Sequence, residues 1–408
     1  MFVSAGPPLP RAPQLNMIPF FAATLLAVAG ADRGPCHEGH IPTTEPGLQS
    51  LTGCSASMLA QDRHGRVAWF DGTYEAGLAK ARAEDRVVML YFYADNARCR
   101  ELDREAFCDD RTVDALEPVV CIPIDADSEA GRVLASSFPT ENYYPALIFL
   151  DPDGELRDRV IGYVEKNTMR SEVDRILRDE ATLGDYRRRV AAQPDDVLAL
   201  WDLAELLDWF DLKAERAKIV ARLHELDPEG KTLPLRMLAM RATLEACTSE
   251  NDYAPLRAFL AEETYSEILF DGWMQIAMYE GMQCKNAKVA GNKEEADARR
   301  IAAFRARFTA WPHSPEMFAA GIGNNIAWDV YLDWPKLPAD LHQEAIRVAR
   351  LASEAKPQSA EILDTLACLL FLDGQVDEAV RLMRECIRLE PDRGLWEDRL
   401  EMFEKEEA

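Results

Sequence analysis

The residues best placed for chemistry lie where an apolar strand runs into a helix that carries Cys99. Two cysteines three residues apart at such a junction form a Cys-x-x-Cys pair. The first of them attacks disulfides, because the positive end of the helix stabilises its thiolate. The position of that first cysteine holds Asn96 in this chain. Asparagine is a favoured helix N-cap, so we expect Asn96 to preserve the helix while removing the nucleophile.

Cys99 stands where the deeper cysteine of such a pair would be, and we expect a buried thiol that is a weak nucleophile. The alternative is a single-cysteine catalytic site at Cys99, assisted in part by the neighbouring Arg98 or Arg100. Cys108 is nine residues further on. That is about 13 Å along a straight helix, too far for a disulfide with Cys99 unless the helix is broken, so a noncanonical dithiol is the less favoured alternative. The later cysteines are expected to be small core residues: Cys121, Cys247, Cys284, Cys368 and Cys386.

Apolar runs alternate with amphipathic stretches between residues 66 and 182, which predicts an α/β domain. The predicted strands are 87–94, 119–125, 146–150 and 160–164, and the predicted helices are 73–86, 96–107, 129–138 and 168–181. The last two strands should form a hairpin, because Asp-Pro-Asp-Gly at 151–154 has the composition of a turn. We therefore expect a mixed central sheet with helices on both faces.

Residues 66–182 resemble the thioredoxin-like domains of exported bacterial proteins. The matching segments are Val88-Met-Leu-Tyr-Phe-Tyr93, Cys99-Arg-Glu-Leu-Asp-Arg-Glu-Ala-Phe107, Ile124-Asp-Ala-Asp127, Tyr144-Pro-Ala-Leu-Ile-Phe-Leu150 and Gly162-Tyr163. The resemblance implies that Pro145 is a cis-proline facing the start of the helix, where a groove for an extended peptide would include Asn96, Arg98 and Tyr144. Asn96 departs from the family's Cys-x-x-Cys pair, so the resemblance does not carry dithiol activity over to this chain.

The remainder of the chain, residues 183–408, is almost entirely helical in pattern. Pro194 and Pro228 are 34 residues apart, as are Pro357 and Pro391, and each interval holds two amphipathic helices. This pattern is similar to tetratricopeptide repeats and predicts a helical-repeat domain. Residues 235–320 are helical in pattern but do not keep the period, and 183–193 is either a linker or a continuous helix.

The N-terminus predicts export. Residues 17–31 are apolar and end in Ala29-Gly30-Ala31, a small-x-small cleavage site, so we expect residues 1–31 to be a signal peptide. The periplasm or cell envelope is the expected location. A short membrane anchor or a disordered leader is the alternative, and Met17 is a second candidate for the first residue of the chain.

Residues 32–65 form a loop-rich leader before the first predicted domain. A disulfide between Cys36 and Cys54 is conceivable in an exported protein. The Cys-His-Glu-Gly-His cluster at 36–40 is more simply incidental than a metal site, because it lies alone in a Pro- and Gly-rich stretch. We find no phosphate-binding loop and no zinc signature, so no metal and no cofactor is expected.

The composition limits the class of partner. The chain has 408 residues, 48% of them hydrophobic and 29% charged, which fits two or three globular domains. A formal net charge of −25 argues against nucleic-acid and anionic-membrane partners, because both need clustered Lys and Arg. The sequence therefore predicts a scaffold for a protein or extended peptide, with a thiol–disulfide oxidoreductase acting through Cys99 as the alternative.

Overall fold

The computed structural model describes residues 64–406. The predicted signal peptide (1–31), the predicted disulfide between Cys36 and Cys54, and the cluster at 36–40 lie outside the described residues. Export, signal cleavage and that disulfide stay predictions.

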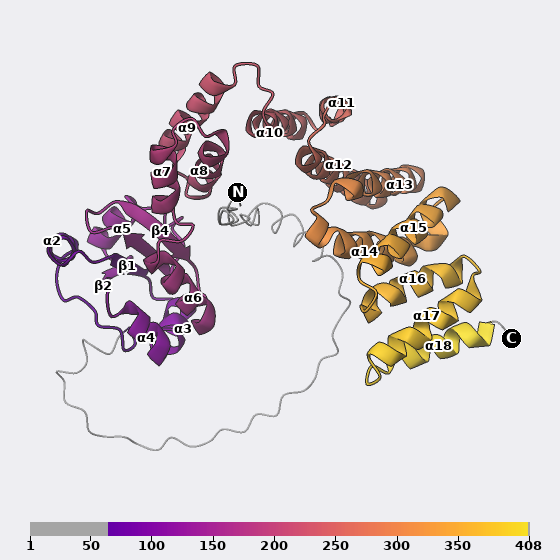
Figure 1. The fold of residues 1–408 in the computed structure, drawn as a ribbon, viewed down its shortest axis with the longest axis horizontal. Helices are drawn as coiled ribbons and strands as arrows, with labels where there is room; N and C mark the ends of the chain where they lie inside the picture. Colours follow the sequence, from indigo (N-terminus) through magenta and orange to yellow (C-terminus); the bar gives the residue numbers. More distant parts are fainter. Residues whose placement is uncertain (1–63, 407–408) are drawn as a thin grey trace, which may run out of the picture. The chain divides into compact units, whose positions relative to one another are not determined.

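The first domain is a four-stranded sheet with helices on both faces (Figure 1). The strand order is β2-β1-β3-β4, with β1 parallel to β2 and with β3 antiparallel to both β1 and β4. The elements in chain order are α2 (Tyr74–Glu84), β1 (Val88–Tyr93), α3 (Ala97–Glu105), α4 (Asp110–Leu116), β2 (Val120–Asp125), α5 (Glu129–Ala135), β3 (Ala146–Leu150), β4 (Leu156–Ile161) and α6 (Lys166–Leu177). The predicted mixed sheet with flanking helices is confirmed.

Alternate side chains of the central strands enter two separate cores, as the two-residue period of a strand requires. Met89 and Tyr91 of β1 pack in one core with residues of α3 and α6, including Leu102 and Val173. The residues between them in β1, such as Leu90, pack in the other core with residues of α2 and α5. Burial on both faces explains why β1 is a continuous apolar run rather than an alternating pattern.

Two elements differ from the sequence-based prediction. The last strand, predicted at 160–164, is β4 at Leu156–Ile161. It was misplaced because charged residues enter the strand: Asp158 is buried and pairs with Arg175 of α6 at 2.9 Å, which compensates its charge. Helix α4, of seven residues, was not predicted.

Everything described after residue 182 is helical. The helices are α7 (Leu183–Ala192), α8 (Val197–Trp209), α9 (Lys213–Leu226), α10 (Leu233–Glu250), α11 (Ala254–Ala261), α12 (Ser266–Val289), α13 (Lys293–Ala310), α14 (Glu316–Asp333), α15 (Ala339–Ala355), α16 (Ala360–Leu372), α17 (Val376–Leu389) and α18 (Leu395–Glu406), with short 3₁₀ turns at Trp311–His313 and Trp334–Lys336. The segment 183–193, left open between linker and helix, is the separate helix α7.

The two 34-residue intervals each hold one helix pair, α8 with α9 and α16 with α17, and the helices of each pair pack together. The small residues Ala367 and Ala379 are fully buried, which lets the second pair approach closely. In the middle of the region the helices are longer: α12 has 24 residues and α13 has 18, against 13 and 14 in α16 and α17. This difference in length explains why residues 235–320 do not keep the period.

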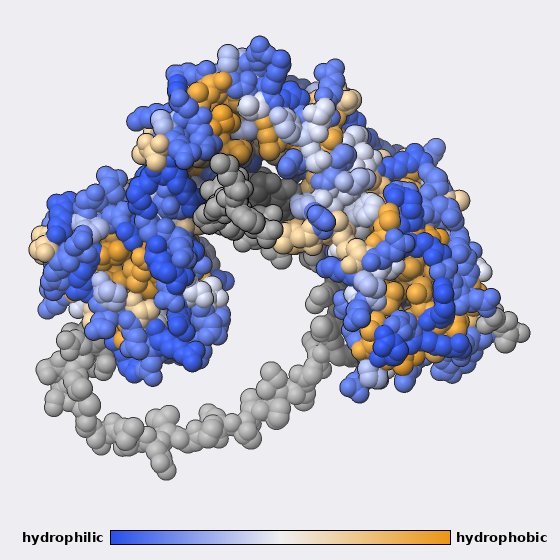
Figure 2. Space-filling model, viewed as in Figure 1, coloured by the Kyte–Doolittle hydropathy of each residue, from blue (hydrophilic) through white to orange (hydrophobic). Residues whose placement is uncertain are grey.

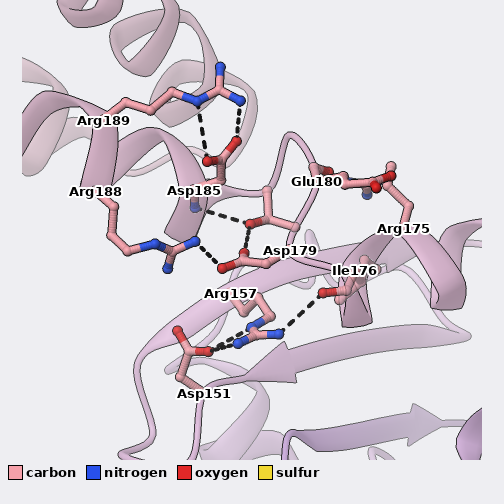
Figure 3. A network of polar contacts seen from close by, with 10 residues as sticks. Asp151, Arg157, Arg175, Ile176, Asp179, Glu180, Asp185, Arg188 and Arg189 are labelled. Carbon is pink, nitrogen blue, oxygen red and sulfur yellow. Dashed lines mark hydrogen bonds and ion pairs between the residues drawn. The ribbon is translucent and has the colours of Figure 1, made fainter.

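A network of ion pairs joins the first domain to α7 (Figure 3). Asp151, after β3, accepts a hydrogen bond from Arg157 of β4 at 2.6 Å, and Arg157 also donates to the carbonyl of Ile176 in α6 at 3.3 Å. Asp179, in the turn after α6, pairs with Arg188 of α7. The contacts of Arg157 connect the hairpin to α6, and the pair Asp179–Arg188 connects the turn after α6 to α7. Arg187 of α7 also donates to the carbonyl of Leu156 in β4 at 3.0 Å.

Arg159 of β4 makes a second connection, to α8. Its side chain is only 2% exposed and lies over the ring of Phe210, with 4.8 Å between guanidinium carbon and ring centroid. It donates to the carbonyls of Trp209 and Pro139 and pairs with Glu141 at 2.8 Å. One buried guanidinium thus links the sheet edge, the end of α8 and the loop that leads to Pro145.

The visible surface is mostly hydrophilic, with apolar side chains exposed over parts of the helical region (Figure 2). Six of the exposed apolar residues lie on α12 and α14: Met278, Met282, Val289, Met317, Phe318 and Leu332. Between residues 64 and 406 we find no helix with the length and apolar character needed to cross a bilayer.

Candidate functional site

The start of α3 is shaped by Asn96. Its backbone is extended (φ −134°, ψ 165°), and its side-chain oxygen accepts a hydrogen bond from the N–H of Cys99 at 2.9 Å. The predicted N-cap is therefore confirmed. The side-chain amide of Asn96 donates to the carbonyl of Tyr144 at 3.3 Å. The Asn96 side chain thus gives a hydrogen-bond partner to a backbone N–H at the start of α3, and it also links this helix to the loop before β3.

Cys99 is a buried thiol, with 2% of its surface exposed. Burial raises the pKa of this thiol, and the negative charge of Asp103 raises it further. Hydrogen bonds from the N–H of Ala94, whose nitrogen lies 3.5 Å from Sγ, and from Asn96 oppose the rise without cancelling it. At neutral pH this environment keeps Cys99 in the thiol form, which is the form that does not attack disulfides.

The loop facing α3 carries Tyr143, Tyr144 and Pro145. The peptide bond between Tyr144 and Pro145 is cis, as the family resemblance implied. Pro145 is buried, and its carbonyl accepts from the N–H of Gly162 at 2.8 Å. Tyr143 is 44% exposed and lies over Gly162, where an added Cβ would come within 3.1 Å of the tyrosine ring. Glycine at 162 therefore lets the loop lie close to the end of β4.

Arg98 is exposed on the first turn of α3, and its guanidinium carbon lies 5.8 Å from the centroid of the Tyr143 ring. The structure thus brings together the four predicted binding residues, Asn96, Arg98, Tyr144 and Pro145, with Asn96 touching Tyr144 directly. Tyr143 is the member that the sequence analysis missed. Its place beside Tyr144 and Pro145 was the available signal. We call the surface formed by these five residues the α3–Pro145 surface.

A polar cluster lies beneath Cys99 on the inner side of α3. The hydroxyl of Tyr91 donates to Asp103 at 2.9 Å, and Nδ1 of His64 lies 3.2 Å from the same carboxylate. Burial raises the pKa of Tyr91 far above its usual range, and the charge of Asp103 adds to the rise. These polar groups act as hydrogen-bond partners for one another. Their contacts fit a role in anchoring α3 to β1 and to the segment before α2.

The other described cysteines offer no dithiol. Cys99 and Cys108 are both free, as their separation predicted, and the thiol of Cys108 donates to the backbone carbonyl of Asp103 at 3.3 Å. Cys121 is buried in β2, where burial raises its pKa to about 12. The four cysteines of the helical region are buried as predicted. Within residues 64–406 we find no group of side chains with the composition of a metal site.

The residues that form the sheet up to the turn after β3 match a known family. Residues 68–152 fit a family model described as thioredoxin-like. This part of the chain is a thioredoxin-like domain. The α3–Pro145 surface lies within the matched residues. A comparison with curated proteins gives no match.

Three solved structures show partial likeness to the chain. A thioredoxin from Thermus thermophilus shares 22% identity, covering 27% of this chain and 87% of that one, with a TM-score of 0.25. The oxidised C-terminal domain of DsbD from Neisseria meningitidis shares 20% identity, covering 26% and 98%, with a TM-score of 0.23. YrrB, a TPR protein with an unusual peptide-binding site, shares 11% identity, covering 52% and 96%, with a TM-score of 0.28. At these values the likeness says nothing about activity.

The helical region resembles tetratricopeptide-repeat proteins in its own architecture. Consecutive helices pack in pairs, and the two 34-residue intervals each hold one pair. The chain is therefore a thioredoxin-like domain followed by a helical-repeat region.

Proposed function

We propose that this protein is a binding scaffold whose thioredoxin-like domain is redox-silent and holds an extended polypeptide segment at the α3–Pro145 surface. One observation carries the proposal. The Asn96 side chain, at the position of the attacking cysteine, bonds both the N–H of Cys99 and the carbonyl of Tyr144. The residue at the expected catalytic position therefore has a structural role, because it links α3 to the loop before β3.

The exposed chemistry of this surface indicates the kind of segment it would hold. Tyr143 offers an exposed aromatic ring and Arg98 an exposed cation beside it. Aromatic residues and arginine are the side chains most often responsible for binding energy at protein interfaces. A segment with an apolar residue next to a carboxylate fits this pair.

The helical region supports a role in protein binding independently. Met278 and Met282 are one turn apart on α12 and both are exposed, and Met317 and Phe318 are exposed on α14. Flexible methionine side chains are frequent on surfaces that accept varied partners. A partner protein that contacts these helices as well as the α3–Pro145 surface would gain affinity from both.

The test is a peptide selected against the full-length chain from a random peptide display library. We expect Tyr143→Ala to weaken its binding about tenfold or more, as expected when an interface aromatic is truncated. Arg104→Ala removes an exposed arginine two turns along the same helix and serves as the matched control, with no expected effect. Equal affinity for wild type and Tyr143→Ala would place the binding site elsewhere.

The alternative is a thiol–disulfide oxidoreductase that uses Cys99 as its single nucleophile. The burial of Cys99 and its raised pKa speak against this alternative. Such an enzyme would need a second thiol from a partner to release the mixed disulfide. The reactivity of Cys99 in the native protein separates the two functions.

A further inference from the structure

A cavity of about 170 Å³ lies among α12, α13 and the end of α14, remote in sequence from the thioredoxin-like domain. A volume of this order holds one small ligand. The charged residues in its lining favour a small polar group. The charged residues in its lining are Lys288, Arg300, Arg307 and Asp333.

The lining thus has three cations and one carboxylate, in a chain whose net charge is −25. Arg300 is almost completely buried, with its side chain 9% exposed, and it pairs with Asp297 at 3.2 Å and with Asp333 at 3.3 Å. These pairs fix the guanidinium in one orientation at the cavity wall. A charged group held this way offers its remaining N–H groups at little further cost in conformational entropy.

Two cationic groups of the lining have unused hydrogen-bonding capacity. Arg307 pairs with Asp329 at 2.7 Å, but its Nε is buried and has no hydrogen-bond partner among residues 64–406. Lys288 is exposed and makes no ion pair within the same residues. A buried donor without a partner is uncommon in folded proteins, and an anion in the cavity would satisfy it.

We propose that this cavity binds a small oxyanion, as a phosphate or carboxylate group of a low-molecular-weight ligand. The group would accept hydrogen bonds from Arg307 and Lys288, with Arg300 adding positive charge from the wall. Polyanions such as nucleic acids are not suitable ligands, because the strongly negative chain repels an extended array of charges. Asp297, Asp329 and Asp333 already pair with the two arginines, so a single small anion would add its contacts at the buried Nε–H of Arg307 and at the ammonium group of Lys288.

The test uses the full-length chain and inorganic phosphate, with acetate as the carboxylate probe. We expect saturable binding of at least one of the two anions, seen as broadening of the phosphate phosphorus resonance or as a rise in the thermal midpoint with added anion. Binding should weaken as sodium chloride is added, because salt screens the attraction. Phosphate binding with no acetate binding assigns a phosphate ligand, and the reverse assigns a carboxylate.

The variant is Lys288→Ala and the matched control is Lys285→Ala, an exposed lysine of α12 that is not in the lining. Neither lysine makes a contact that the fold requires, so both variants should fold. We expect Lys288→Ala to weaken anion binding about tenfold and Lys285→Ala to leave it unchanged. Absence of saturable binding to wild type, or equal weakening by the two variants, would overturn the proposal.

Discussion

Asn96→Cys is expected to create dithiol–disulfide activity in the thioredoxin-like domain. The new thiol would take the N-cap position, where the N–H of Cys99 now bonds to Asn96 at 2.9 Å, and the helix terminus would lower its pKa. Positions 96 and 99 are three residues apart at a helix start, within the distance that a disulfide spans. The new thiolate would attack a substrate disulfide and release one sulfur as a thiolate. Cys99 would then displace the other sulfur and close a disulfide between positions 96 and 99.

The measurement is turbidity from insulin reduction, with dithiothreitol as the reductant that regenerates the dithiol. Wild type and Asn96→Ser should give only the background rate of dithiothreitol, because serine restores an N-cap without a thiol. The cysteine variant should exceed that background clearly, at a loss in stability of about 1 kcal/mol from the weaker cap. A folded Asn96→Cys variant with no activity would show that position 96 does not correspond to the attacking cysteine of the family.

Arg399→Ala is expected to lower the free energy of unfolding of the helical region by about 3–5 kcal/mol. Arg399 of α18 pairs with Asp364 of α16, which is only 6% exposed. Burial already raises the pKa of Asp364 in spite of this pairing. Removing the arginine would leave a buried carboxylate without its partner, which costs more than the pair contributes.

Equilibrium urea unfolding followed by circular dichroism measures this effect. Arg388→Ala is the control: Arg388 is exposed and pairs with Glu385 on the surface of α17, so no measurable change is expected. Adding Asp364→Asn to Arg399→Ala should recover part of the loss, because the neutral amide costs less to bury than a lone carboxylate. Equal stability of Arg399→Ala and wild type would show that Asp364 is solvated or paired differently.

The sequence was sufficient where a local rule decided the structure. Asn96 was predicted as an N-cap from its residue type, and β3 was predicted at its observed bounds because all its residues are apolar. The helix pairs near Pro194 and Pro357 were found from their period. In these cases the signal lies within a few residues or repeats at a fixed interval, so a pattern in one sequence reveals it.

The remainder depends on contacts between distant residues. The bounds of strand β4 were predicted wrongly because a charged residue such as Asp158 is typical of the surface. Its burial depends on the ion pair with Arg175 of α6, which is distant in the sequence. Tyr143 is next to Tyr144 in the sequence, but the glycine that lies under its ring, Gly162, is distant in the sequence. The cavity brings Lys288 of α12 to the end of α14, at Asp333. No local pattern contains these neighbours, so sequence reasoning did not find them.

The alkylation rate of Cys99 as a function of pH decides whether this thiol is a working nucleophile. Cys108 is partly exposed and will react, so the modified peptide must be identified by mass spectrometry for each cysteine. Cys99→Ser provides the assignment control. We expect Cys99 to stay unmodified across neutral pH and to react only when urea unfolds the domain. Fast modification of native Cys99, with an apparent pKa well below the free value of about 8.5, would overturn the redox-silent scaffold and identify a single-cysteine enzyme.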